Sequence, residues 1–195
     1  MPEQISRNAR VGAIALAIFA PAHGFVTLQG PDVSPLAFAC WLGVSFGILC
    51  LCEELGAARP LNRAGLVLFG AAFCGRLIVV LAPDPTLNVR AQLLYAFAAM
   101  GALAFWSAAL MHRPNASRAV GILGAAASGS TLALILVAHL MAGSATIWGF
   151  SRLFSALVNP ALDTSGATTT INMILALWGL VTAGLLWTHS LRSAD

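Results

Sequence analysis

Charged residues are scarce in this chain. Only 9% of its 195 residues are charged and 59% are hydrophobic, whereas an average soluble domain carries about 25% charged residues. A soluble protein of this length needs a polar surface that so few charges would not cover. The composition therefore excludes an ordinary soluble domain and indicates a protein that lies mostly in lipid.

Several functional signatures are also missing. Lysine is absent, and the ten arginines are dispersed along the chain rather than clustered as in nucleic-acid-binding proteins. The sequence contains no G-x-S-x-G, no H-E-x-x-H and no glycine-rich phosphate loop. We therefore expect no nucleic-acid partner, and we favour a protein without catalytic activity because no nucleophile stands out.

The four cysteines lie inside apolar segments and form no C-x-x-C pair. This spacing supports neither a zinc site nor a thioredoxin-like motif. Cys40 and Cys74 fall at a similar depth, so a disulfide between them is one interpretation. The other is that both thiols serve as small apolar side chains.

Long apolar runs are what the chain does contain. A membrane-spanning helix needs about 20 residues, and short connections with proline, glycine, asparagine or charged residues join antiparallel neighbours in a helix bundle. The pattern predicts an all-α transmembrane bundle of six helices in a single domain. The six runs cover residues 11–29, 34–52, 64–82, 91–111, 119–142 and 170–190.

The placement of the arginines predicts the orientation of this bundle. Arginine is enriched in the cytoplasmic segments of membrane proteins. If both termini are cytoplasmic, only Arg90 and Arg152 fall on the outer side, and both ends on one side requires an even number of spans. Together with the composition, this predicts a multi-pass protein of a bacterial cytoplasmic (inner) membrane. The arginines on the cytoplasmic side would be Arg7, Arg10, Arg59, Arg63, Arg113, Arg118 and Arg192.

The first apolar run has a second interpretation. Two arginines, an apolar segment and Ala20-Pro21-Ala22 resemble a signal peptide with its cleavage site. Cleavage would leave five spans. We expect an uncleaved first helix, because the apolar run continues beyond this motif to Leu28.

The connection between the fifth and sixth runs is longer than the others. Between Ile147 and Val158, apolar residues recur at helical spacing beside Trp148 and Arg152, which favour membrane interfaces. The pattern predicts a short amphipathic helix on the outer membrane surface. A cap packed over the end of the bundle is an equally good interpretation.

Arg76 is the one charged residue of the third run, and placing it within a membrane costs free energy. A buried arginine at mid-span costs about 2.5–3.5 kcal/mol even on lenient insertion scales, so some interaction must offset this cost. In a structural role, Arg76 would extend to lipid phosphates or pair with Asp84. In a functional role, it would hold an anion in an inward-facing polar pocket.

His23 and His139 are predicted to share the depth of Arg76, in the outer half of the membrane. The three residues form our candidate site for a lipid headgroup or another small anionic ligand, in a pocket that opens outward. Polar residues of the outer loops and span ends would lie just above it. They are Asp32, Asp84, Asn88, Arg90, Arg152, Asp163 and Asn172. No acidic residue lies within a run, which argues against a proton-coupled or cation-coupled transporter.

The histidines also permit an alternative with a cofactor. A membrane redox protein with b-type haem needs histidine pairs on facing helices. His23 with His139, and His112 with His189, would supply one pair near each membrane face. Against this, His112 and His189 stand at the ends of runs, where histidine is common.

Small residues recur at a spacing that lets helices approach closely. Gly43-x-x-x-Gly47 and Gly124-x-x-x-Ser128 both follow this pattern. Packing within the bundle is the default interpretation. Contact with a second copy, or with a partner in a membrane complex, is the alternative, and membrane lipids are the other expected partners.

The layout resembles a family of bacterial and archaeal membrane proteins. The six short spans, the DVSPL stretch at 32–36 and the PDP stretch at 83–85 carry this likeness. The family is domain-of-unknown-function nine-nine-eight, and the resemblance implies a six-span fold but no activity. The extended connection at 143–169 and Arg76 depart from the family pattern.

The haem alternative has a direct spectroscopic test. A protein with haem b between paired histidines shows a Soret band in its absorption spectrum, and His23→Ala should weaken that band by removing one axial ligand. The spectrum of the purified protein, before and after reduction, measures this. A spectrum without a Soret band would end the haem hypothesis.

Overall fold

The computed structural model describes residues 6–29, 35–56, 59–81, 85–113, 116–141 and 164–188. Side chains are described for most of these residues, but not for 29, 85, 86, 89, 93, 134–141 or 164–170. The described residues form six α-helices and contain no strand. The helices are α1 (Arg7–Gln29), α2 (Pro35–Leu55), α3 (Pro60–Leu81), α4 (Pro85–Met111), α5 (Ala116–Met141) and α7 (Thr164–Thr188).

Helices α1, α2, α3, α4 and α7 each contain a segment long and apolar enough to cross a membrane. For α5 this assessment covers only part of the helix, because its side chains are described only up to residue 133. The all-helical prediction is confirmed. The amphipathic helix predicted within 147–158 falls outside the described residues. The predicted connection 143–169 is too long at its end, because residues 164–169 already belong to α7.

Helices α3 and α4 begin earlier than the apolar runs predict, and the reason is proline. Pro60 and Pro85 look like breaks in the sequence, but they are the first residues of α3 and α4, and Pro35 opens α2 in the same way. At the first helical position, the missing N–H of proline costs nothing because that group has no partner within the helix. The segments 60–63 and 85–90 are therefore helical.

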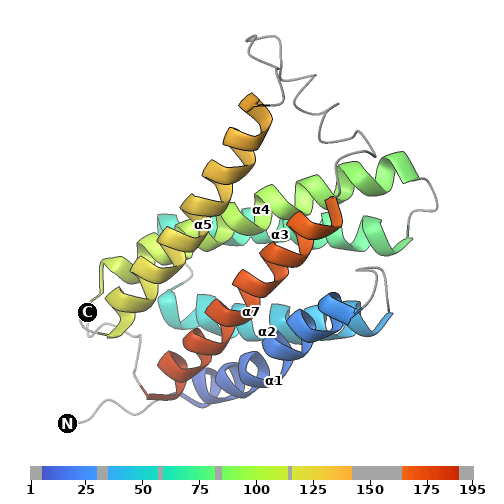
Figure 1. Ribbon diagram of the computed structural model, residues 1–195. Coiled ribbons are helices and arrows are strands. Elements are labelled where there is room, and N and C mark those ends of the chain that lie inside the picture. The colour runs from blue at the N-terminus through green and yellow to red at the C-terminus, as the bar shows by residue number, and fades with distance from the viewer. Residues whose placement is uncertain are drawn as a thin grey trace.

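The six helices form a closed ring in the order α2, α1, α7, α5, α4, α3. Contacts are extensive between α1 and its neighbours α2 and α7, and between α4 and its neighbours α3 and α5. The α2–α3 and α5–α7 contacts are much smaller. The fold thus consists of two three-helix groups, α7–α1–α2 and α3–α4–α5, that meet along a seam. In Figure 1, α1 and α2 lie on one side, α3 and α4 on the other, and α7 crosses obliquely between them.

Consecutive helices run in opposite directions. The start of α1 lies beside the end of α7, since Ala13 and Ala17 share a groove with Gly184 and Trp187. The same end of the bundle holds the start of α3, where Asn62 bonds to the end of α2. We call this the arginine-rich end. It carries Arg7, Arg10, Arg59, Arg63, Arg113 and Arg118.

The first helix is continuous through Pro21 to Gln29. Residues before the Ala20-Pro21-Ala22 motif belong to the core: Ala13 and Leu16 are buried, and Leu16 packs where α2 carries Gly47.

The surface of the bundle is apolar. Large side chains such as Val67 (73% exposed), Leu36 (61%) and Leu177 (61%) point outward from three different helices. A soluble monomer seldom exposes so many large apolar side chains, whereas lipid tails solvate them well. All four cysteines are free thiols, so Cys40 and Cys74 form no disulfide. Cys40 is buried, but Cys74 is exposed, so the interpretation of both as buried thiols is wrong for Cys74.

A chain of aromatic rings fills the seam between the two helix groups. Trp41 of α2 lies 5.3 Å from Tyr95 and 5.6 Å from Phe69 between ring centroids. Phe69 lies 5.5 Å from Trp106, which stacks on Trp178 at 6.4 Å. These separations fall within the favourable range for aromatic pairs. The rings therefore join α2 and α7 of one group to α3 and α4 of the other.

Asn62 closes the seam at the arginine-rich end. Its Nδ2 donates to the carbonyl oxygens of Cys52 (2.7 Å) and Gly56 (3.0 Å), while its Oδ1 accepts from Trp106 Nε1 at 3.1 Å. Both amide protons are used, so this fully buried polar side chain is satisfied. It ties α3 to α2 and α4 at once.

The small-residue motifs pack within the chain. A Cβ added at Gly43 would meet the Phe19 ring at 2.2 Å, and one at Gly47 would meet Leu16 at 2.6 Å. A Cβ at Gly124 would meet Ser107 Oγ at 2.2 Å. These glycines therefore let α2 approach α1 and let α5 approach α4, as small residues do between membrane helices.

Gly75→Ala should destabilise the fold, because a Cβ there would lie 2.9 Å from Ala91 O and from Tyr95 N on the α4 backbone. A backbone cannot yield as a flexible side chain can, so we expect a loss of about 1–3 kcal/mol. Gly70→Ala is the matched control on α3, since nothing lies within 4 Å of its added Cβ.

Thermal unfolding of both variants in detergent measures the difference. Gly70→Ala should unfold at the wild-type temperature or slightly above it, because alanine favours the helix. Equal destabilisation by the two substitutions would contradict the close α3–α4 packing.

Candidate functional site

Polar side chains from four helices meet in the core, away from the arginine-rich end. They are His23 of α1, Arg76 of α3, Tyr95 of α4 and Asn172 of α7, and none is more than 1% exposed. Burying polar groups is costly unless they interact with one another or with a ligand. We call these four residues the polar cluster.

Arg76 lies deep in the bundle and not on its lipid-facing surface. Its side chain is 0% exposed, and its Cζ lies 5.4 Å from the centroid of the Tyr95 ring. A guanidinium at this distance from an aromatic ring is stabilised by the electrons of the ring. The adjacent Gly75 brings α3 against the α4 backbone next to Tyr95. The local sequence thus positions the arginine. The interpretation in which Arg76 extends to lipid phosphates does not match this burial.

Tyr95 connects the two helix groups through a hydrogen bond. Its hydroxyl donates to Oδ1 of Asn172 at 2.6 Å. The phenol ring meanwhile contacts Arg76 on one side and the Trp41 ring in an edge-on arrangement. One residue of α4 therefore touches α2, α3 and α7.

His23 completes the polar cluster from α1. Its Nδ1 lies 3.1 Å from the carbonyl oxygen of Ala37, and its ring lies 5.4 Å from the Trp41 ring. The charge of Arg76 acts on the imidazole, and Asn172 approaches the same ring. Thr27, one turn further along α1, bonds back to the carbonyl oxygen of His23.

Two hydrogen-bonding atoms around the polar cluster have no partner of normal geometry. They are Nε2 of His23 and Nε1 of Trp41, both buried. Leaving such an atom unsatisfied costs about 1–3 kcal/mol. A ligand atom that bonded either nitrogen would recover this cost.

The polar cluster combines a positive charge with hydrogen-bonding groups. Arg76 brings a guanidinium and the neighbouring Trp41 an indole N–H, whereas the Tyr95 hydroxyl donates to Asn172 and Nδ1 of His23 faces the Ala37 carbonyl. The described residues contain no group of three or more potential metal ligands. The arrangement can hold and orient an anionic group, and it lacks a serine or cysteine nucleophile within the polar cluster.

The structure brings two of the three predicted site residues together. His23 and Arg76 interact in the core. His139 belongs to α5, but its side chain is outside the described set. His112 is exposed at the arginine-rich end, and His189 lies outside the described residues, so neither histidine pairing for haem is tested. Asp32, Asp84 and Asp163 also lie outside the described residues.

The sequence interpretation missed Tyr95 and Trp41 and placed Asn172 only at the end of a span. Tyr95 is the single tyrosine of the chain, and a lone phenol in the middle of an apolar run is the signal that could have identified it. Trp41 had no such signal, because four other tryptophans are distributed among the runs and loops.

The chain matches no family model, no curated protein and no solved structure. The resemblance to domain-of-unknown-function nine-nine-eight therefore stays a prediction. Any functional conclusion has to come from the geometry of the chain itself.

Tyr95→Phe and Asn172→Ala test the hydrogen bond that links the two helix groups. Tyr95→Phe keeps the ring next to Arg76 but removes the donor to Asn172 Oδ1. In a double-mutant cycle we expect a coupling free energy of about 0.5–2 kcal/mol, the range for hydrogen bonds between membrane helices. Unfolding of the single and double variants in detergent measures it, and additive effects would show that the bond contributes nothing.

Proposed function

We propose that this chain is a six-span protein of a bacterial cytoplasmic membrane that binds a lipid or small anionic ligand through Arg76 and His23. Both termini lie in the cytoplasm, and the polar cluster lies in the outer half of the membrane. Membrane lipids surround the bundle, and Gly70, Gly129 and Gly184, which have nothing within 4 Å of an added Cβ, leave small-residue positions for a second copy or another membrane protein.

Support for the orientation comes from the arrangement of the helices. Six described arginines share one end of the bundle, while Arg90 lies on α4 toward the other end. Cationic residues on the cytoplasmic side set the orientation of membrane proteins. The start of α1 and the end of α7 lie at that same end, which an even number of spans requires.

The burial of Arg76 beside His23 and Tyr95 is the observation that carries the ligand-binding proposal. An arginine in this position costs about 2.5–3.5 kcal/mol, and contact with one aromatic ring returns about 0.5–2 kcal/mol. A bound anion that contacted the guanidinium would make use of this buried charge.

The position of the polar cluster also suits a ligand site. It lies on the seam between the two helix groups, where contacts are fewer than within either group. Both groups contribute residues to it. Sites between helices of a bundle are formed by inward-facing side chains of this kind. Arg76 of α3 and the indole N–H of Trp41 on α2 belong to different groups, so an anion that contacted both would bridge the groups.

Arg76→Leu should abolish ligand binding while leaving the fold intact or more stable, because the burial cost of the charge disappears. Arg90→Leu is the matched control, since Arg90 is exposed on the neighbouring helix. The assay is thermal unfolding of the purified protein with added phosphate, acetate or phosphatidylglycerol. Saturating ligand at 100 times its dissociation constant stabilises by about 2.7 kcal/mol.

We expect one of these probes to stabilise the wild type and the Arg90→Leu variant but not the Arg76→Leu variant. If Arg76→Leu merely lowers expression and stability, and no probe stabilises the wild type, the arginine has a structural role.

The orientation has its own test. A fluorescent protein fused to the C-terminus should fluoresce, and alkaline phosphatase fused at the same position should be inactive, because both ends are predicted to be cytoplasmic. Phosphatase fused in the 143–169 connection should be active. The reverse pattern would overturn the orientation.

A further inference from the structure

A groove runs between α5 and α7 on the lipid-facing side of the bundle. Its volume is about 210 Å³, and three residues of α5 and four of α7 line it. Two of these residues, Leu123 and Leu177, are 60% and 61% exposed, so the groove opens sideways toward the surrounding lipid. Since an apolar cavity of about 150 Å³ holds a benzene ring, this groove accepts a group of that size.

The lining of the groove selects a neutral group. Apart from the indole N–H of Trp178, its side chains are apolar, such as Val120 and Ala127 on the α5 wall and Ile174 and Val181 on the α7 wall. A phosphate or an ionised carboxylate here would lose its water without gaining a charged partner, which costs several kcal/mol. The groove therefore suits a lipid with an uncharged head.

Trp178 brings a buried hydrogen-bond donor to this groove. The residue is 6% exposed, and its Nε1 has no acceptor among the described residues. This nitrogen faces α5, because a Cβ added at Gly124 would lie 2.6 Å from it. Gly124 shares a helix face with Val120 and Ala127, about one turn to either side, so the N–H borders the groove.

No nearby protein group satisfies this donor. Ser107 Oγ of α4 lies close to the same point of α5, 2.2 Å from a Cβ added at Gly124, but it does not accept from Trp178. An unmet buried N–H costs about 1–3 kcal/mol, which a carbonyl oxygen entering from the groove would recover. Contacts between α5 and α7 are much smaller than those of either helix with its other neighbour, so few contacts have to be broken to reach the nitrogen.

The depth of Trp178 restricts the kind of carbonyl that can reach it. With a rise of about 1.5 Å per residue, Trp178 lies about 15 Å along α7 from Thr188, which is half of a hydrocarbon core of about 30 Å. Tryptophan is usually found at the membrane interface, where its N–H reaches water or headgroups. The ester carbonyls of phospholipids stay at that interface. A carbonyl at the depth of Trp178 belongs to a lipid whose head dissolves in the hydrocarbon.

We propose that this groove binds the head ring of a membrane quinone, with one quinone oxygen accepting a hydrogen bond from Trp178 Nε1. A quinone ring is flat, neutral and similar in size to benzene, and its carbonyl oxygens are acceptors only. Its apolar tail lies among the lipid tails beside the exposed leucines of the groove. Binding at this site uses neither Arg76 nor His23, so it is independent of the polar cluster.

The experiment measures equilibrium binding of radiolabelled decylubiquinone to the purified full-length protein in detergent. The ring of this quinone is fully substituted, so it does not add to the free thiols of the chain. Three unlabelled competitors are compared with unlabelled decylubiquinone. Decylbenzene keeps a ring and a tail without the carbonyls, decanoate carries a charged carboxylate, and phosphatidylcholine supplies acyl chains and ester carbonyls.

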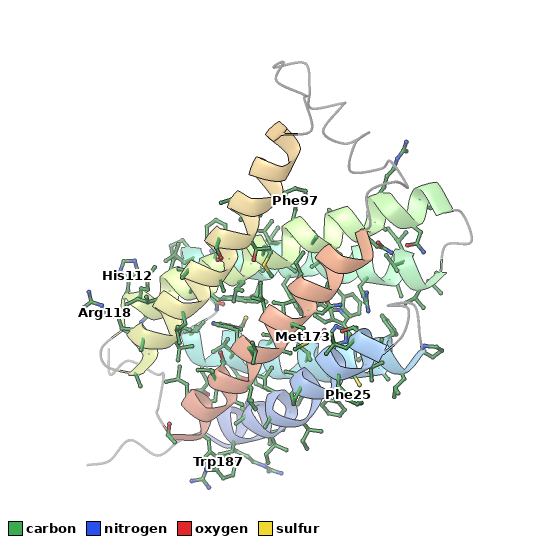
Figure 2. All side chains as sticks on the ribbon, viewed as in Figure 1. Phe25, Phe97, His112, Arg118, Met173 and Trp187 are labelled. Atoms are coloured by element: carbon green, nitrogen blue, oxygen red, sulfur yellow. The ribbon has the colours of Figure 1, made fainter. Side chains whose placement is uncertain are left out.

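Two variants change different parts of the site, and each has a matched control. Trp178→Phe removes the N–H and keeps an aromatic ring; its control is Trp187→Phe, at a position that is 53% exposed near the end of the same helix (Figure 2). Ala127→Phe fills the groove from the α5 wall, and its control is Ala126→Phe at the adjacent exposed position, which does not line the groove. Because Ala127 is only half-buried, this variant also serves if Trp178→Phe fails to fold.

We expect the wild type and both controls to bind decylubiquinone with similar affinity. Trp178→Phe should bind it about three- to tenfold more weakly, the effect of losing one hydrogen bond, and Ala127→Phe should show no binding. Decylbenzene, decanoate and phosphatidylcholine should compete poorly. Arg76→Leu should leave quinone binding unchanged, which separates this site from the polar cluster.

Three outcomes would overturn the proposal. If decylbenzene competes as well as the quinone, the groove recognises no carbonyl and takes only an apolar body. If decanoate or phosphatidylcholine competes as well, the groove is a site for acyl chains. If Ala127→Phe and Trp178→Phe both bind the quinone like their controls, or if the wild type does not bind it, the groove is not a quinone site.

Discussion

A guanidinium inside an apolar bundle has few ways to lower its free energy, and the core of this protein is organised around that constraint. Arg76 is wholly buried, yet its neighbours are polar or aromatic groups from three other helices. Gly75 permits the close approach of α3 to α4 that places the Tyr95 ring beside the charge. Tyr95 then reaches Asn172 of α7, so the accommodation of one charge connects elements that are far apart in sequence.

The two-group architecture follows from where the extensive contacts lie. Within each group, glycines bring helices close together, as at Gly47 against Leu16 and Gly75 against Ala91. Between the groups, large aromatic rings fill the seam and hold the helices further apart. Between membrane helices, association depends on packing and hydrogen bonds rather than on the hydrophobic effect. The aromatic chain and the bonds of Tyr95 and Asn62 are therefore what keeps the two groups together.

The sequence predicted the helices and the depth of the main polar residues, but not which faces they share. Hydropathy locates all six helices, although Pro60 and Pro85, which suggest breaks in the sequence, begin helices in the structure. The cost of Arg76 and the depth of His23 identified two members of the polar cluster. The rotation of each helix about its axis was out of reach, because lipid and core are equally apolar and leave no periodic signal. Tyr95 and Trp41 could only be placed once the helices were packed.

The seam holds two polar layers, one around Asn62 and one formed by the polar cluster. They differ in whether their hydrogen-bonding atoms have partners within the chain. Asn62 uses both amide protons and its oxygen within the chain, so its layer is complete and serves as a structural anchor. In the polar cluster, a full positive charge lies beside His23 Nε2 and Trp41 Nε1, which have no partner of normal geometry. Both layers are equally buried, so burial alone does not explain the difference. A structural layer gains nothing from hydrogen-bond donors beyond those it satisfies, whereas a binding site needs a donor for its ligand. The unpartnered indole N–H of Trp41 beside the buried charge, rather than the depth of the layer in the membrane, is therefore the stronger argument that this layer binds a ligand.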